Sequence, residues 1–183
     1  PATGNPESSE APWLAIRNAI VWRKQRTLHD LDFFGESAQV GFEDDRGPDH
    51  IAIRYDLDYD VLGGASYLIA HRGTLRYRRE LGTWDVGASY AIRARDFRRT
   101  TEAAFDGHVQ TGELAATLHA TTELDLDGRL FGSREVTEDP LFTDWTGGAQ
   151  IGVRARPRDR LRLAASAATW YSLYDGLDPN GDQ

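Results

Sequence analysis

The stretch HIAIRYDLDYDV, residues 50–61, alternates apolar and polar side chains along its whole length. Its large apolar residues stand at the odd positions, from Ile51 to Val61, and its polar or small residues stand at the even positions. This period of two is the pattern of a β-strand with one apolar and one polar face. Similar segments recur along the chain, and we expect nine strands at residues 13–26, 36–44, 49–61, 68–81, 84–96, 107–122, 128–136, 144–155 and 161–174.

The expected strands are long, with 9–16 residues each. Strands of about 5–6 residues are usual in soluble sandwiches, whereas a tilted strand needs about 9–11 residues to cross a membrane. The connections alternate in length. Short ones are expected at 45–49, near 82, at 125–127 and at 156–160, and longer ones lie between them. This alternation is typical of outer-membrane barrels.

The sequence therefore predicts an all-β fold, an antiparallel up-and-down transmembrane β-barrel with about 8–10 visible strands, either as the whole barrel or as part of a larger one. We expect residues 1–12 to be a linker or tail and residues 13–183 to form the barrel. Bacterial single-chain barrels have even strand counts. Nine strands therefore lead us to expect a barrel that is incomplete at its C-terminus, with at least one returning strand missing.

Composition excludes several function classes. The mean hydropathy of −0.54 comes with no apolar stretch near the ~20 residues of a membrane helix. The net charge of −8 argues against a nucleic-acid partner. The absence of cysteine removes disulfides, thiolate metal sites and a cysteine nucleophile. The five histidines show no metal-type spacing, so neither a metal nor a cofactor is expected.

Charged residues gather on the polar faces of the third, fourth and fifth expected strands, where a barrel would enclose them in its lumen. One interpretation is a charged constriction that selects or retains an anionic solute. The other is a narrow interior filled with paired charges. This predicted lumen cluster consists of Arg54, Asp56, Asp58, Arg72, Arg76, Arg78, Glu80, Asp85, Arg93 and Arg95.

Aromatic residues lie mostly toward the strand ends, where outer-membrane barrels carry girdles at the two membrane interfaces. An ordinary aromatic core is the alternative. The candidates for the girdles are Trp13, Tyr67, Trp84, Trp145, Trp170 and Tyr171.

One region of about 50 residues has further motifs. A Gly63-Gly64-x-x-Tyr67 loop leads into a strand with His71, the next strand ends in Arg95-Asp96-Phe97, and Asp106-Gly107 opens another. This region resembles the outer-membrane barrels that follow tetratricopeptide repeats in Gram-negative bacteria, such as the surface lipoprotein assembly modifiers. The resemblance implies a scaffold or export role in the cell envelope. No helical repeat domain is present in this sequence.

The function expected from these observations is a non-enzymatic barrel in the bacterial outer membrane that serves as an anchor, a pore or an export module. Its partners would be outer-membrane lipid and envelope proteins. A first alternative is a soluble barrel that binds an apolar ligand inside, because the pattern alone does not tell inside from outside. A second is an outer-membrane lipid-modifying enzyme that uses Ser89, His71 and an acid such as Glu80.

Overall fold

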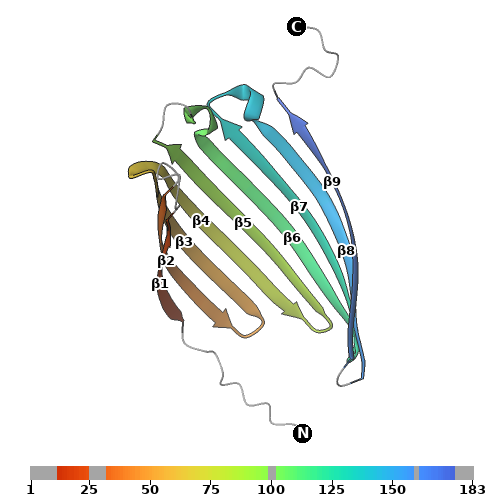
Figure 1. Cartoon of the computed structure of the whole chain (residues 1–183). Coiled ribbons are helices and arrows are strands. Elements are labelled where there is room, and N and C mark those ends of the chain that lie inside the picture. The colour runs from red at the N-terminus through yellow and green to blue at the C-terminus, as the bar shows by residue number, and fades with distance from the viewer. Residues whose placement is uncertain (1–11, 25–31, 99–101, 159–160, 176–183) are drawn as a thin grey trace, which may run out of the picture.

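The computed structural model describes residues 12–24, 32–98, 102–158 and 161–175. Nine antiparallel strands form one sheet in which each strand pairs with its neighbours in the sequence, from β1 to β9 (Figure 1). The strands are β1 (Trp13–Arg23), β2 (Phe33–Arg46), β3 (Asp49–Leu62), β4 (Ala65–Leu81), β5 (Trp84–Phe97), β6 (Gly107–Thr121), β7 (Leu124–Thr137), β8 (Asp144–Arg158) and β9 (Leu161–Tyr174).

All nine expected strands are present, and the prediction of an all-β, up-and-down antiparallel arrangement is confirmed. The largest difference concerns β7, which begins at Leu124 and not at residue 128. The expected turn at 125–127 is therefore wrong. Asp125 and Asp127 resemble turn residues by composition, but both carboxylates are held inside the strand ladder by basic neighbours, His119 and Arg154.

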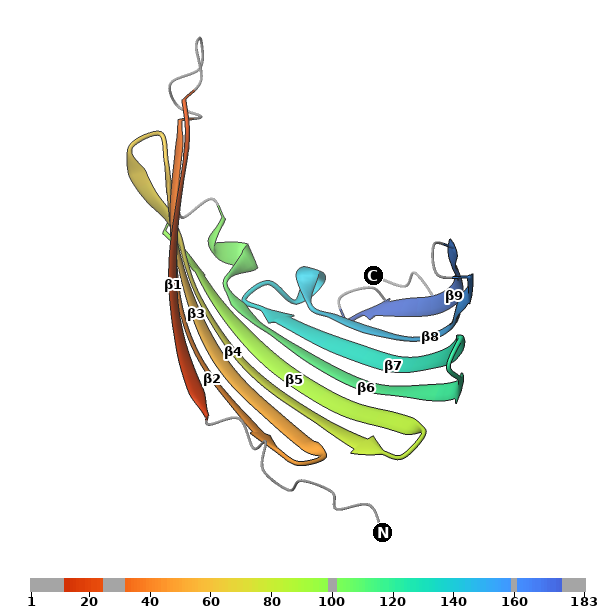
Figure 2. The same cartoon turned by 90° about the horizontal axis from the view of Figure 1, so that it is seen from below.

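The sheet curves strongly about one axis and remains open, with β1 and β9 as its two edges (Figure 2). The strands run obliquely across the curve (Figure 1). Irregularities in the pairing occur at Asp60/Val61, at His119/Thr121 and at Ala155/Arg158, close to strand ends. Such bulges raise local twist and bending, which favours the curvature of the sheet.

The four connections at one end of the sheet are short, and three of the four at the other end are longer. The longer connection expected at 62–67 is wrong, because β3 and β4 are joined there by the two-residue turn Gly63–Gly64, whose positive φ values glycine readily adopts. At the short-turn end, Gly47 and Gly82 adopt φ values of 63° and 65°, which a residue with a side chain rarely adopts. At the long-connection end, two 3-10 turns, η2 (Ala103–Phe105) and η3 (Pro140–Phe142), fold over the strand ends. No helix in the described ranges is long and apolar enough to cross a bilayer.

The described strands have almost no dry core. Within the described ranges, only six residues are buried: Gly35, Leu68, Ala70, Thr137, Thr143 and Gly147. A soluble domain of ordinary architecture buries a sheet face against a second layer. Here a single layer carries the whole fold, so the exposed apolar face needs cover that the described residues do not supply.

Candidate functional site: the charged concave face

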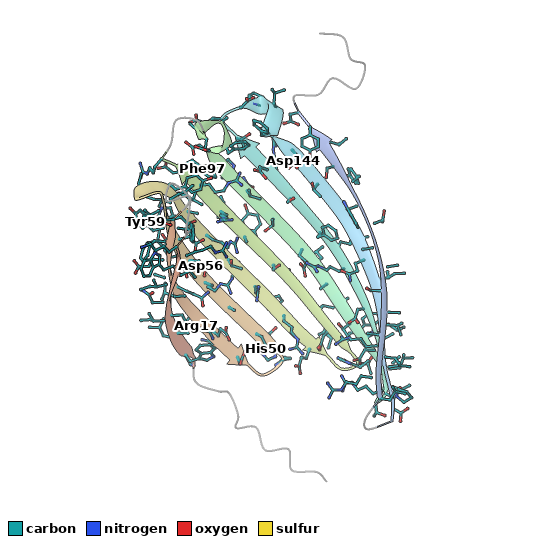
Figure 3. All side chains as sticks on the ribbon, in the orientation of Figure 1. Arg17, His50, Asp56, Tyr59, Phe97 and Asp144 are labelled. Atoms are coloured by element: carbon teal, nitrogen blue, oxygen red, sulfur yellow. The ribbon has the colours of Figure 1, made fainter. Side chains whose placement is uncertain are left out.

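The strand alternation separates two populations of side chains on the two faces of the sheet. On β3 the even-numbered residues from His50 to Asp60 are half-buried, while Ile51, Ile53 and Tyr55 are exposed. On a curved single layer, side chains of the concave side converge and cover each other, so the less exposed, charged population marks the concave face. Figure 3 shows Asp56 on the inner side of the curve and Tyr59 on the outer side.

Ion pairs that skip a strand support this assignment. Arg93 on β5 reaches Asp58 on β3 at 3.6 Å, across the intervening β4. Arg95 on β5 pairs with Glu135 on β7, across β6. Adjacent strands lie about 4.8 Å apart, so such contacts need side chains that lean toward one another.

The structure places all ten residues of the predicted lumen cluster on the concave face. Most of its acidic groups have basic partners: Arg54–Asp56 at 3.1 Å, Arg78–Glu80 at 3.1 Å and Arg78–Asp85 at 2.6 Å. The side chains of Arg72 and Arg76, by contrast, form no ion pair or hydrogen bond with any other described residue. The cluster therefore combines a paired majority with two unpaired arginines.

The short-turn end of the concave face carries a continuous chain of ionisable groups, which we call the rim network. His50 joins Asp45 at 2.7 Å to Glu80 at 3.5 Å, and Glu80 leads through Arg78 to Asp85. His119 continues the chain by contacting Asp85 at 3.4 Å and Asp125 at 2.7 Å. The network thus links β2 to β7 and comprises Asp45, His50, Arg78, Glu80, Asp85, His119 and Asp125.

Both histidines of the rim network stand next to short turns and favour the protonated form. The hydrogen bond with Asp45 raises the pKa of His50 above its ordinary value of 6.5. The hydrogen bond with Asp125, followed by that with Asp85, raises the pKa of His119. A cation on each ring would complete an alternation of negative and positive groups around this end of the sheet.

Sequence reasoning missed part of the concave charge. Asp127 accepts hydrogen bonds from Arg154 at 2.6 and 2.9 Å and from Thr117 at 2.9 Å. Arg129 pairs with Glu113 at 2.5 Å. The signal was present, because Leu124, Leu126 and Leu130 alternate with these polar residues in the sequence. The expected strand nevertheless began at residue 128, because Asp125 and Asp127 are residues typical of turns.

The residues of the family-like motif mostly meet at the long-connection end. The rings of Tyr67 and Phe97 lie 5.6 Å apart, and Phe97 lies 6.3 Å from Phe105, a residue of η2. The Asp106 carboxylate accepts a hydrogen bond from the backbone N–H of Phe97. Gly63 and Gly64 form the β3–β4 turn with φ values of 61° and 79°.

Gly107 has the clearest steric requirement in this motif. Its φ is 149°, and a Cβ atom at this position would stand 1.9 Å from the carbonyl oxygen of Val136. His71 does not join the motif's other residues, because it lies on the convex face and bonds the Tyr55 hydroxyl at 2.6 Å. Asp96 pairs with Arg98 at 3.2 Å. Most of the motif therefore builds one end of the sheet.

The six predicted interface aromatics divide between the faces. Trp84, Trp145 and Tyr171 lie on the convex face, and Tyr67 packs on Phe97 at the strand end. Trp13 and Trp170 lie on the concave face, where they pair with Glu43 and Gly148. In this register neither can belong to an aromatic belt on the convex side.

The convex face carries an apolar band that crosses the sheet obliquely. Near the long-connection end its polar boundary passes through Glu36 on β2 and Asp96 on β5, which fall in one row of the cross-strand register. On β7 the polar boundary is at Arg134, which falls in the cross-strand row of Ile92. On β5 this row lies four residues nearer the short turns than the boundary residue Asp96. The apolar band therefore shifts along the strand direction from β2 to β7. Such a shift is expected where strands tilted relative to the membrane normal cross a layer of constant height.

The residues considered for a hydrolase do not assemble. Ser89 and Glu80 lie on the concave face, whereas His71 lies on the convex face with Tyr55 as its partner. Among the described residues, no group of three or more histidine, aspartate or glutamate side chains is arranged to hold a metal ion. Searches against family models, curated proteins and solved structures found no match for this chain.

Proposed function

We propose that this chain is the membrane-spanning part of a non-enzymatic β-barrel in the bacterial outer membrane, which serves as an anchor, a pore or an export module. The observation that carries the proposal is the oblique apolar band of the convex face, backed by a charged concave face. Lipid would cover the first and water would fill the second.

The dimensions of the band fit a bilayer. On β5 the convex residues from Trp84 to Ala94 are all apolar, which is about 34 Å of extended chain at ~3.4 Å per residue. At a tilt near 45° this length spans about 25 Å, the height of the apolar band in outer-membrane barrels. Charged convex residues, such as Asp49 and Arg79, stand at the strand ends, where lipid headgroups would contact them.

The open edges also bear on this proposal. The backbone groups along β1 and β9 have no ladder partner on their outer sides within the described sheet. A bilayer cannot satisfy such groups, so a spanning sheet must close. We therefore propose that these two edges are paired in the functional barrel. The resemblance to barrels that follow tetratricopeptide repeats supports placement in an envelope assembly.

A soluble barrel that carries an apolar ligand needs its apolar face inside. The curvature of the described sheet puts the charged residues inside and exposes large residues such as Ile53, Leu114 and Ile151 outside. A lipid-modifying enzyme based on Ser89 and His71 would need both side chains on one face. The geometry supports the non-enzymatic barrel best.

Heat-modifiable migration tests the proposal. The natural full-length protein is expressed, extracted from the outer-membrane fraction and run on a denaturing gel with and without boiling. A closed barrel should migrate differently when unboiled, and it should remain with the membrane after washing with 5 M urea. Recovery as a folded monomer in detergent-free buffer would contradict the proposal.

A further inference from the structure

We propose that the concave face between β1 and β4 holds a binding site for a small phosphate-bearing oxyanion. The site is a groove of about 310 Å³ that continues into a smaller one of about 100 Å³. We call the two together the arginine groove, because four arginines from three strands line them: Arg17, Arg54, Arg72 and Arg76. This inference rests on the proposed function, in which the concave face encloses water.

The positive charge of the arginine groove exceeds the negative charge available to it. Asp56 is already engaged through both oxygens, by Arg54 at 3.1 Å and by the Gln39 amide at 2.6 Å. Asp58 faces Arg93 at 3.6 Å. Arg17, Arg72 and Arg76 consequently have no acidic partner within the described part of the chain. Glu43, the remaining acid, lines the smaller pocket of the arginine groove but not the larger one.

The register adds repulsion that an anion would relieve. Arg72 lies directly opposite Arg93 in the β4–β5 ladder, and like charges in this position destabilise a sheet. The Nε atom of Arg93 and the hydroxyl of Thr74, which lines the smaller pocket, are buried without a hydrogen-bond partner. A buried hydroxyl without a partner is costly, so a ligand oxygen that reaches Thr74 from the smaller pocket would be stabilising.

The groups present favour a phosphate over a carboxylate. Guanidinium forks bind both oxyanions in bidentate fashion. Here the four guanidinium groups come from three strands, β1, β3 and β4, that line the same groove, which suits an anion with several oxygens. A chain with a net charge of −8 has no general attraction for anions, so binding has to be local.

Calorimetric titration with pyrophosphate tests the inference. The folded barrel in a neutral detergent at low salt should bind pyrophosphate with about one site per chain. The double variant Arg17→Gln/Arg72→Gln should weaken binding at least tenfold. Arg134→Gln removes the same kind of charge from the convex face, where Arg134 has no described partner, and should change binding less than twofold. If the double variant fails to fold, Arg72→Gln alone should weaken binding at least threefold.

The outcomes separate the alternatives. Absence of pyrophosphate binding by the heat-modifiable wild-type barrel would overturn the inference while leaving the proposed function standing. Equal losses in the groove and control variants would also overturn it, because they would indicate diffuse electrostatic attraction. A second titration uses micelles doped with an anionic phospholipid. Arginine-dependent binding of the lipid phosphate without binding of free pyrophosphate would contradict a soluble ligand.

Discussion

The convex and concave faces of this sheet come from the same strands, yet their side chains differ in composition. The convex face is apolar through its middle on the strands from β2 to β9, apart from His71, which is bonded to Tyr55, and Thr169 on β9. The concave face varies from densely charged on β3–β5 to small and neutral in the middle of β9, with Ala164, Ser166 and Ala168. The uniformly apolar convex face indicates one common environment along its middle. On the concave face, the choice of residues instead depends on the local pairing of charges.

The largest expected effect comes from placing a charge on each face at adjacent positions of one strand. Ala167 lies on the convex side of β9 and Ser166 on its concave side, beside Gly152 and near Asp127. Ala167→Arg should destabilise the inserted barrel by about 2–4 kcal/mol, the cost of a basic residue at the bilayer midplane. Ser166→Arg should cost less than about 1 kcal/mol.

Reversible unfolding in urea from lipid vesicles measures both changes. Wild-type protein and Ser166→Gln serve as controls for insertion and for side-chain size. Equal destabilisation by the two arginines would contradict the distinction between the faces.

A second prediction concerns the anion selectivity of the proposed channel. Arg76→Ala and Arg93→Ala remove positive charge from the lumen, so each should reduce the preference of the open channel for anions in planar bilayers. The reversal potential in a salt gradient reports this preference. Unchanged selectivity in fully inserted protein would contradict a role of these two arginines in selecting anions.

A smaller effect is expected from breaking one concave ion pair. Asp127→Asn keeps the shape of the side chain but removes the charge that faces Arg154 and weakens the acceptor of Thr117. Since these groups are partly exposed, the free energy of unfolding should fall by about 0.5–1 kcal/mol. Thr117→Val tests the neutral hydrogen bond alone. A loss comparable to that of Ala167→Arg would contradict the comparison of the faces.

The smallest effect is a pH dependence of the rim network. Because the pKa values of His50 and His119 are raised in the folded state, their contribution is fully present below their ordinary pKa of 6.5 and is lost as pH rises through the folded values. The urea midpoint should therefore be slightly higher at pH 6 than at pH 8. His50→Gln/His119→Gln should remove this difference, and a difference that persists in the double variant would assign it to other groups.

The sequence predicted the strands well because alternation is a local signal. All nine were expected, and β9 has the expected bounds of 161–174. β7 was shortened because Asp125 and Asp127 look like turn residues until their partners, His119 and Arg154, are known. Those partners lie on the neighbouring strands β6 and β8, and the local sequence around the two aspartates does not reveal these pairings.

The candidate site was harder to predict from the chain. That the lumen cluster would share one face follows from period two. The sequence does not show which of its arginines lack partners. Asp56 could pair with Arg54 on its own strand or with Arg72 directly opposite, and in the structure it pairs with Arg54. Arg17 was not expected at all, because its place in the groove depends on the curvature that brings concave side chains of β1 and β3 to one groove across β2.

The central claim is the proposal that the convex face contacts lipid, and single-cysteine labelling tests it most directly. The chain has no cysteine, so a fluorophore at Ile53→Cys or Leu114→Cys on the convex side, or at Ala52→Cys or Ala115→Cys on the concave side, reports one position at a time. In vesicles, lipid-attached quenchers should quench the convex labels and aqueous iodide the concave ones. The reverse pattern, or equal iodide quenching at all four positions, would contradict the account.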